Sequence, residues 1–370
     1  MQTTRSAALS VDLSLLRKNV ETVFTSLGGV GIIPVLKADA YGLGMTALAK
    51  TLAPCEQVCC FAVAQVPEGL TLRECGIEKP ILVLGEALPA QIEAAIKADL
   101  SLTVGRVSDV ESFARAAARH KKRARIQIKF DTGLHRIGVE ETNFYALCGA
   151  LTAHRDALSP EGAYSHFADP GDAALCERQF RLFTALCDRL EQAGFPVPLR
   201  HIADSAASER YPAYALDAVR LGRRLAWDAP TGRPFGTREI ASLRAAVLDI
   251  RDRKAGDRLG YGDGLTLNHD ARIAVLGIGY GDGLDPRMAQ LRLPVLLHGT
   301  RCPILYCFMD QTLVDVTGVP AAIGDFAVLF GSDDTGAFLS APAQANACGA
   351  NEGCALTTAL LPRVERVYYE

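Results

Sequence analysis

A lysine that ends an apolar segment is the first feature of the chain that could do chemistry. Lys37 follows the run VGIIPVL of residues 30–36, and Tyr41 stands four residues later. A lysine partly withdrawn from water has a lowered pKa, and its neutral amine can form a Schiff base with a carbonyl compound. A lysine that merely extends from a strand end to solvent would look the same, so other residues must decide between these interpretations.

Several other polar side chains also lie at or just beyond the ends of short apolar runs. Lys129 and Arg136 belong to KFDTGLHRIG, His166 to SHFAD, Ser205 to HIADSA, and Arg220 to RLG. Singly, each has a structural explanation, such as a buried histidine, a serine that caps a helix, or an arginine in an ion pair. Together they predict one site, provided that the runs are parallel strands whose ends meet.

The runs alternate with segments of helical length, which is the pattern of βα units and a parallel sheet. Eight runs occupy residues 30–36, 59–63, 80–85, 100–105, 125–130, 162–167, 199–203 and 218–222. Eight strands close a (β/α)₈ barrel of the TIM type, in which functional groups gather at the C-terminal strand ends. An open, doubly wound parallel sheet is the alternative.

The remaining third of the chain has a different pattern, without the alternation of strands and helices. Short strands separated by Gly, Asp and Pro turns are predicted at residues 247–250, 273–278, 293–297, 303–307, 313–316 and 327–329. The Pro- and Gly-rich residues 227–236 are interpreted as a linker. The predicted domains are therefore a barrel over residues 1–232 and a mainly-β domain over residues 233–370. The segment GYGDGL occurs at residues 260–265 and again at 279–284, which we interpret as a shared turn type.

Composition excludes several classes of function. The 370 residues carry a net charge of −3, so there is no basic field to hold nucleic acid, and a small-molecule partner is expected. No apolar run approaches the roughly 20 residues that cross a bilayer, so we expect a soluble, cytoplasmic protein without a membrane contact. Eleven cysteines without a CxxC pair indicate reduced thiols, neither a disulfide framework nor a metal site.

The ordered set of segments resembles one family. VLKADAYGLG is similar to the cofactor-lysine signature of alanine racemases, which are pyridoxal 5'-phosphate enzymes with a barrel followed by a β domain. KFDTGLHRIG, SHFAD, HIADSA, RLG, GYGDG and CFMDQTLVDVT follow in the order that the family has. The resemblance implies an isomerase that interconverts L- and D-alanine through a pyridoxal-phosphate aldimine and supplies D-alanine for peptidoglycan. It also implies a homodimer with shared active sites.

The resemblance implies two catalytic bases. Lys37 would hold the cofactor and act as one base, and Tyr261, contributed by the other subunit, would act as the second. Racemisation removes a proton from one face of the α-carbon and returns one to the other face, so two bases on opposite faces suit the reaction. A phenol with a reference pKa near 10 needs neighbours that stabilise its anion, and His166 and Arg220 match the family positions that do so. Arg220 would also face the pyridine nitrogen of the cofactor.

Further residues match the family's binding positions. Arg136 would lie near the phenolic oxygen of the cofactor and the substrate carboxylate, supported by Lys129, which is carbamylated in several relatives. Tyr280 and Met309 would belong to the wall that the partner subunit contributes to the active site and that receives the substrate. The cofactor phosphate would be held by four residues, namely Tyr41, Ser205, Gly222 and Arg223.

The chain also departs from the family pattern. Arg223 and Arg224 follow Gly222 where relatives usually continue with an aliphatic residue, and Ala226-Trp227 replaces a Tyr-Gly pair. Cys354 stands where many relatives carry a phosphate-binding tyrosine. We expect Arg223 to replace the missing phosphate contact by binding the cofactor phosphate itself, because a charge-assisted hydrogen bond is roughly twice as strong as a neutral one.

Three alternatives remain open at this point. Serine could be the substrate on the same scaffold, because an apolar pocket rejects an added hydroxyl only weakly. Another pyridoxal-phosphate reaction, such as decarboxylation or aldol cleavage, would need no second base, which makes Tyr261 an argument against it. A non-catalytic cofactor-binding barrel would lack the β domain.

Overall fold

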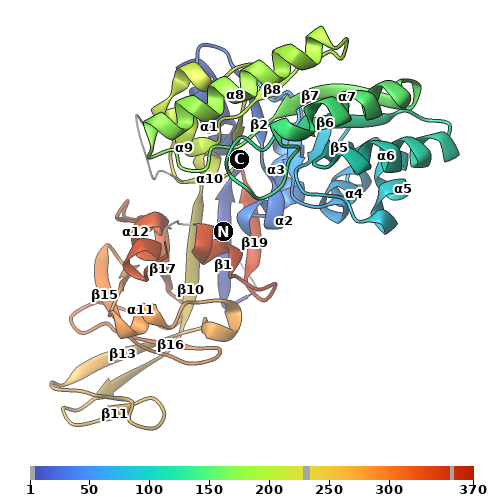
Figure 1. The fold of residues 1–370 in the computed structure, drawn as a ribbon. Coiled ribbons are helices and arrows are strands. Elements are labelled where there is room, and N and C mark those ends of the chain that lie inside the picture. Colours follow the sequence, from blue (N-terminus) through green and yellow to red (C-terminus); the bar gives the residue numbers. More distant parts are fainter. Residues whose placement is uncertain (1–4, 228–233, 351–353) are drawn as a thin grey trace.

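The computed structural model describes residues 5–227, 234–350 and 354–370. The chain folds into a barrel part and a β domain, which Figure 1 shows one above the other. Hydrophobic residues buried below the barrel helices continue into the β domain as one core, so the two parts pack against each other. Within the described residues, no helix is long and apolar enough to cross a membrane. All eleven cysteines lie in these residues and carry free thiols.

Eight parallel strands form the barrel. They are β2 (Gly31–Pro34), β3 (Phe61–Val63), β4 (Ile81–Val83), β5 (Ser101–Val104), β6 (Ala124–Lys129), β7 (Leu158–Tyr164), β8 (Arg200–His201) and β9 (Ala218–Leu221). Strands β3 to β8 pair in sequence order, and β2 pairs with β9. The ring is completed by the backbone hydrogen bond from Arg220 N to Ala203 O (3.0 Å) and by the bridge between Val35 and Ala62. Every predicted run overlaps one strand, although β7 begins four residues before its run, so the barrel is confirmed and the open sheet was wrong.

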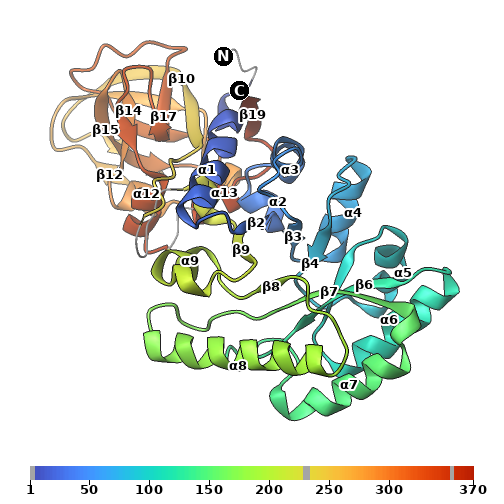
Figure 2. The same cartoon turned by 90° about the horizontal axis from the view of Figure 1, so that it is seen from above.

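Helices follow the strands and cover the outside of the barrel. They are α1 (Leu13–Ser26), α2 (Lys37–Tyr41), α3 (Met45–Leu52), α4 (Val66–Glu74), α5 (Pro89–Lys97), α6 (Val107–Arg119), α7 (Phe144–Ala153), α8 (Ala173–Gln192), α9 (Ser205–Arg210) and α10 (Arg223–Ala226). The long helix α8 lies along the outer edge in Figure 2. It begins where the Asp172 side chain accepts from the Leu175 N–H, and it buries Phe183, Leu186 and Leu190 at helical spacing.

The β domain is an antiparallel barrel. Its strands are β10 (Ala241–Arg253), β13 (Ala271–Leu276), β14 (Pro294–Leu297), β15 (Thr300–Cys307), β16 (Thr312–Asp315) and β17 (Phe326–Ser332), with β18 (Phe338–Leu339) at one edge. The additional pairing of β17 with β10 closes the ring. All six predicted strands are found. Outside the ring lie the hairpin β11 (Arg258–Leu259) and β12 (Leu265–Thr266) and the helices α11 (Arg287–Gln290), α12 (Ala341–Ala347) and α13 (Cys354–Thr358).

The first strand differs from the predicted domain division. β1 (Ala7–Asp12) pairs antiparallel with β10 and parallel with β19 (Glu365–Tyr369), so it belongs to the sheet of the β domain and not to the barrel. Its alternating pattern is short, and its partners lie more than 200 residues away, so nothing local indicates the pairing. The predicted boundary between residues 232 and 233 lies outside the described residues and stays a prediction.

Candidate active site

The C-terminal ends of the barrel strands surround one cavity. Nine of the residues singled out in the sequence line it, namely Lys37, Tyr41, Lys129, Arg136, His166, Ser205, Arg220, Gly222 and Arg223. They come from the ends of β2, β6, β7, β8 and β9 or from the loops and helices that follow. The barrel therefore brings together, from distant parts of the chain, all the barrel residues that the family resemblance points to.

Arg220 is the most heavily supported side chain of the cavity. The residue is only 4% exposed. Its guanidinium donates to Nδ1 of His166 (3.0 Å), to Nδ1 of His201 (2.8 Å), and to the carbonyls of Ser165 and Ile202 (both 2.8 Å). Burial lowers its pKa to about 10, so at neutral pH it remains a cation held in one orientation.

The two histidines beside Arg220 are neutral. Burial, with the charge of Arg220 next, lowers the pKa of His166 to about 3, and the same causes hold the pKa of His201 well below its usual value. Because Nδ1 of each imidazole accepts from Arg220, the proton of each ring resides on Nε2. Nε2 of His201 accordingly donates to Oε1 of Gln127 (2.8 Å). The histidines thus orient the guanidinium and add no charge to the cavity.

Lys129 is a buried amine in the same cavity. It is 3% exposed, and its Nζ lies 5.6 Å from the ring centroid of Tyr164. The pKa of Lys129 is lowered to about 8. Burial is the largest cause, and the nearby positive charges of Arg136 and Arg220 act in the same direction. Burial also raises the pKa of Tyr164 to about 12, so this ring stays a neutral phenol that donates to the Leu84 carbonyl (3.0 Å).

The segment that carries Lys37 has an unusual backbone. The four residues after Lys37 have φ between 52° and 58°, which is a left-handed turn without a glycine. Each such residue costs about 1–2 kcal/mol, so the surroundings must hold the turn. Lys37 itself is exposed in the single chain, and its Nζ lies 5.8 Å from the Tyr41 ring centroid. The partial burial of Lys37 expected from the sequence is therefore not found in the single chain.

Side chains from both parts of the molecule hold this turn. The Glu68 carboxylate, on α4, accepts from the N–H of Ala38 (2.8 Å). Thr357, a fully buried residue of α13, donates its hydroxyl to the Tyr41 carbonyl (2.7 Å), and Arg366 donates to the next carbonyl along the chain (3.2 Å). None of these residues was singled out in the sequence, because their role follows from contacts and not from a motif.

One end of the cavity is suited to a phosphate. A Cβ placed on Gly222 would lie 2.1 Å from Oη of Tyr41, so only a glycine lets this hydroxyl rest against the backbone. Ser205, 5% exposed, is the first residue of α9, and it lines the cavity together with Arg223. Two hydroxyls, a close backbone and a guanidinium are groups that bind phosphate oxygens. Cys354 does not line the cavity.

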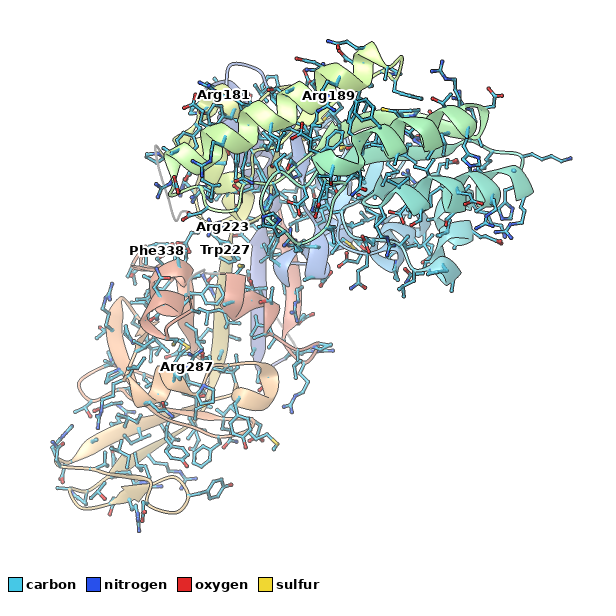
Figure 3. All side chains as sticks on the ribbon, viewed as in Figure 1. Arg181, Arg189, Arg223, Trp227, Arg287 and Phe338 are labelled. Atoms are coloured by element: carbon cyan, nitrogen blue, oxygen red, sulfur yellow. The ribbon has the colours of Figure 1, made fainter. Side chains whose placement is uncertain are left out.

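The second arginine of the changed segment has a different position. The Arg224 side chain is 1% exposed, and its Nε lies 2.6 Å from Oε1 of Glu209, whose side chain is fully buried. Arg223 and Trp227, which flank it, lie where the barrel meets the β domain in Figure 3. Arg224 thus faces α9 beneath the surface, whereas Arg223 faces the cavity.

The predicted β-domain residues form a separate group. Tyr261, Met309 and Tyr280 are 78%, 58% and 45% exposed, and none lines the barrel cavity. Tyr261 lies in the β11–β12 hairpin, at the end of the β domain away from the barrel in Figure 1, and its ring packs edge-on against Phe308 (centroids 5.3 Å apart). Both GYGDG copies close a turn in which the glycine N–H donates to the tyrosine carbonyl three residues before it, at 3.0 and 3.1 Å.

Comparisons with known proteins cover both parts of the chain. The family model "Alanine racemase, N-terminal domain" matches residues 11–230, and "Alanine racemase, C-terminal domain" matches residues 240–368. The alanine racemase of Halothermothrix orenii is 35% identical over 346 residues, covering 90% of this chain and 89% of that protein. Alanine racemase 1 of Caldanaerobacter subterraneus is also 35% identical, over 339 residues, covering 89% and 87%.

Solved structures show the same similarity. The alanine racemase from D-cycloserine producing Streptomyces lavendulae superposes with a TM-score of 0.91 at 29% identity, covering 100% of this chain and 98% of that chain. The alanine racemase from Bacillus anthracis with bound L-Ala-P gives a TM-score of 0.90 at 28% identity, covering 100% and 96%.

Proposed function

Since the chain belongs to the alanine racemase family and interconverts L- and D-alanine, we propose which of its groups carry out the reaction. The observation that supports the assignment is that Lys37, Arg220 and a phosphate-binding end share one cavity, while Tyr261 is exposed elsewhere. The full-length match to alanine racemases leaves no support for a decarboxylase, an aldolase or a non-catalytic barrel.

The cofactor that fits the cavity is pyridoxal 5'-phosphate. When bound, it supplies an aldehyde that combines with amino groups and a ring that withdraws electrons from the α-carbon. Lys37 would hold it at one end, and Tyr41, Ser205, Gly222 and Arg223 at the phosphate end. The close approach of Tyr41 to Gly222 is the feature of this chain that supports the fit.

Arg220 controls where protons can go. A guanidinium with a pKa of about 10 keeps its proton at neutral pH, so Arg220 would donate a hydrogen bond to the ring nitrogen of the bound cofactor without protonating it. By keeping its proton, Arg220 would limit the electron withdrawal that the bound cofactor supplies, and would so favour return of the proton to the α-carbon over transamination. His166 and His201 keep the guanidinium in place through Nδ1.

The two bases are Lys37 Nζ and Tyr261 Oη of a second copy. Tyr261 of the same chain lies outside the cavity, and Lys37 and Arg136 are exposed, so the cavity is open to water on the side that a second copy would cover. Each base takes or returns a proton on its own face of the α-carbon. We therefore propose a homodimer whose two active sites each combine both chains.

Substrate recognition is assigned to both copies. Arg136 binds the carboxylate of alanine. Burial lowers the pKa of Lys129 to about 8, so at neutral pH this amine is still mostly protonated and adds a second positive charge to the cavity. Tyr280 and Met309 of the second copy bound the space for the substrate side chain and keep it small.

Arg223 supplies the phosphate contact that other relatives take from the tyrosine replaced here by Cys354. It lines the cavity together with Tyr41, Ser205 and Gly222. Because hydrogen bonds to charged groups contribute about 1.5–3 kcal/mol, Arg223→Ala should weaken binding of pyridoxal phosphate by roughly 10-fold or more. An unchanged dissociation constant would contradict the assignment.

Free thiols support a reducing compartment, so we place the enzyme in the cytoplasm, where it supplies D-alanine for peptidoglycan.

The deciding experiment mixes two inactive variants. Lys37→Ala and Tyr261→Phe are purified separately, unfolded or dissociated together, and reassembled at equal concentrations. A mixed dimer has one site with both bases intact, so about a quarter of the wild-type activity should return if half of the dimers are mixed. Racemisation of L-alanine and, in parallel, L-serine is followed by chiral chromatography. If the mixture stays as inactive as its components, the shared site is wrong.

A further inference from the structure

We infer that the buried ion pair between Glu209 and Arg224 sets the positions of the two short helices that carry the phosphate-binding residues. Glu209 and Arg224 are in this view positioning residues for the cofactor phosphate. The inference rests on the proposed function, because it presumes that a phosphate occupies that end of the cavity.

The pair is a two-point contact between α9 and α10. Nε of Arg224 lies 2.6 Å from Oε1 of Glu209, and Nη2 lies 3.0 Å from Oε2. The Nη2–Oε2 contact is a hydrogen bond, and the Nε–Oε1 contact is a close ion-pair contact outside hydrogen-bond geometry. Together the two contacts restrict the separation of the side chains. Arg224 also donates from Nη1 to the Trp227 carbonyl (3.2 Å), which ties the guanidinium to the end of its own helix.

The two helices need an external contact to stay in place. α9 has six residues and α10 has four, which is too short for either helix to be stable by its own hydrogen bonds. Ser205 is the first residue of α9, and Arg223 is the first residue of α10. The side chains of Ser205 and Arg223 both line the cavity, so the distance between two phosphate-binding groups depends on how α9 and α10 are joined.

Stability alone does not account for such a pair. A fully buried ion pair loses much of its attraction to desolvation, and apolar side chains of similar size often replace one without loss. Glu209 also stands in the last turn of α9, where the helix dipole disfavours a carboxylate. Beyond apolar packing, the pair offers a directional contact. A charge-assisted hydrogen bond together with a second close ion-pair contact restricts the arrangement of α9 and α10, whereas apolar side chains allow several arrangements.

The test compares a ligand that has the phosphate with one that lacks it. Dissociation constants of pyridoxal phosphate and of pyridoxal are measured for the full chain and for Glu209→Leu/Arg224→Met, which removes both charges and keeps the volume. We expect pyridoxal phosphate to bind at least roughly 10-fold more weakly to the variant, with pyridoxal binding and the melting temperature unchanged. A double variant of the partly buried Arg125–Glu161 pair, on β6 and β7 outside the cavity lining, should leave both constants unchanged.

The outcomes separate this inference from the proposed function. If the ratio of the two dissociation constants is the same in the variant as in the wild type, the pair does not position the phosphate site. If the wild-type chain itself does not prefer pyridoxal phosphate to pyridoxal, the proposed function fails first. Should the double variant not fold, Arg224→Lys keeps both charges but loses the second contact, and an unchanged ratio there overturns the inference equally.

Discussion

The barrel cavity and the exposed end of the β domain differ in how far a single chain completes them. In the cavity, the guanidinium of Arg220 donates hydrogen bonds to four different residues, and Arg220 is 4% exposed. At the end of the β domain, Tyr261 is 78% exposed and packs edge-on against Phe308. Under the proposed assignment, this difference means that cofactor binding belongs to one chain, whereas proton transfer on the second face of the substrate requires two.

The largest expected effect separates the two regions by spectrum. Lys37→Ala and Tyr261→Phe should each lower racemisation by about 10²–10⁴-fold, because each removes one acid–base group. Only Lys37→Ala should also remove the visible absorbance of the lysine-bound cofactor, since Tyr261 does not line the cavity. Racemisation and absorbance are measured on the same samples. Tyr145→Phe, a change at an equally exposed tyrosine on α7, is the control and should leave both readings unchanged.

A second change should damage the cavity while leaving the β domain intact. Gly222→Ala places a methyl group 2.1 Å from Oη of Tyr41, and such overpacking costs about 1–3 kcal/mol. We expect the affinity for pyridoxal phosphate, measured by titration, to fall roughly 10-fold to 100-fold. Gly149→Ala on α7 is the matched control, because nothing lies within 4 Å of its added Cβ. Equal affinities in the two variants would show that Tyr41 and Gly222 need no close approach.

Much of the barrel and its cavity could be predicted from the sequence because the signals are local. Each strand is a short apolar run, and Lys37, Lys129, His166 and Arg220 lie at or near the C-terminal ends of such runs. In a parallel barrel these ends meet, so order along the chain becomes neighbourhood in space. The family resemblance then added roles that residue types alone leave open.

What could not be predicted depends on contacts between distant segments. The left-handed turn after Lys37 consists of Ala, Asp, Ala and Tyr, a run without glycine that gives no signal for that backbone in the sequence, and hydrogen bonds with Glu68 and Thr357 help to hold it. The pairing of β1 with β10 joins segments without any shared pattern. Charged residues are mostly exposed, so the buried contact of Glu209 with Arg224 has no sequence signal either.

The pH dependence of the free energy of unfolding tests whether one chain alone forms the environment of His166 in the cavity. The pKa of His166 is about 3 in the folded chain and near 6.5 when unfolded. Between these values only the unfolded chain binds the proton, so stability is greatest above pH 6.5 and falls as the pH falls towards 3. From pH 7 to pH 5 we expect a loss of about 2 kcal/mol for this group.

Urea unfolding at pH 7 and pH 5 measures this loss. His166→Asn should reduce the dependence on pH, whereas His135→Asn, at a side chain that is 79% exposed, should not. The difference between the two variants should be the same at high and low protein concentration, because burial and Arg220 of the same chain already lower the pKa of His166 to about 3. A concentration-dependent difference would mean that the second copy contributes to the environment of His166.

The smallest expected effect tests whether the β domain of the same chain supports the cavity. Thr357→Val removes the hydrogen bond to the Tyr41 carbonyl and leaves the size of the buried side chain nearly unchanged. Loss of one such bond costs about 1 kcal/mol, so pyridoxal phosphate should bind roughly fivefold more weakly. Thr358→Val is the matched control, because its exposed hydroxyl bonds only within α13. If both variants bind the cofactor equally well, the barrel holds the turn after Lys37 by itself, and the hydrogen bond from Thr357 to the Tyr41 carbonyl does not contribute to cofactor binding.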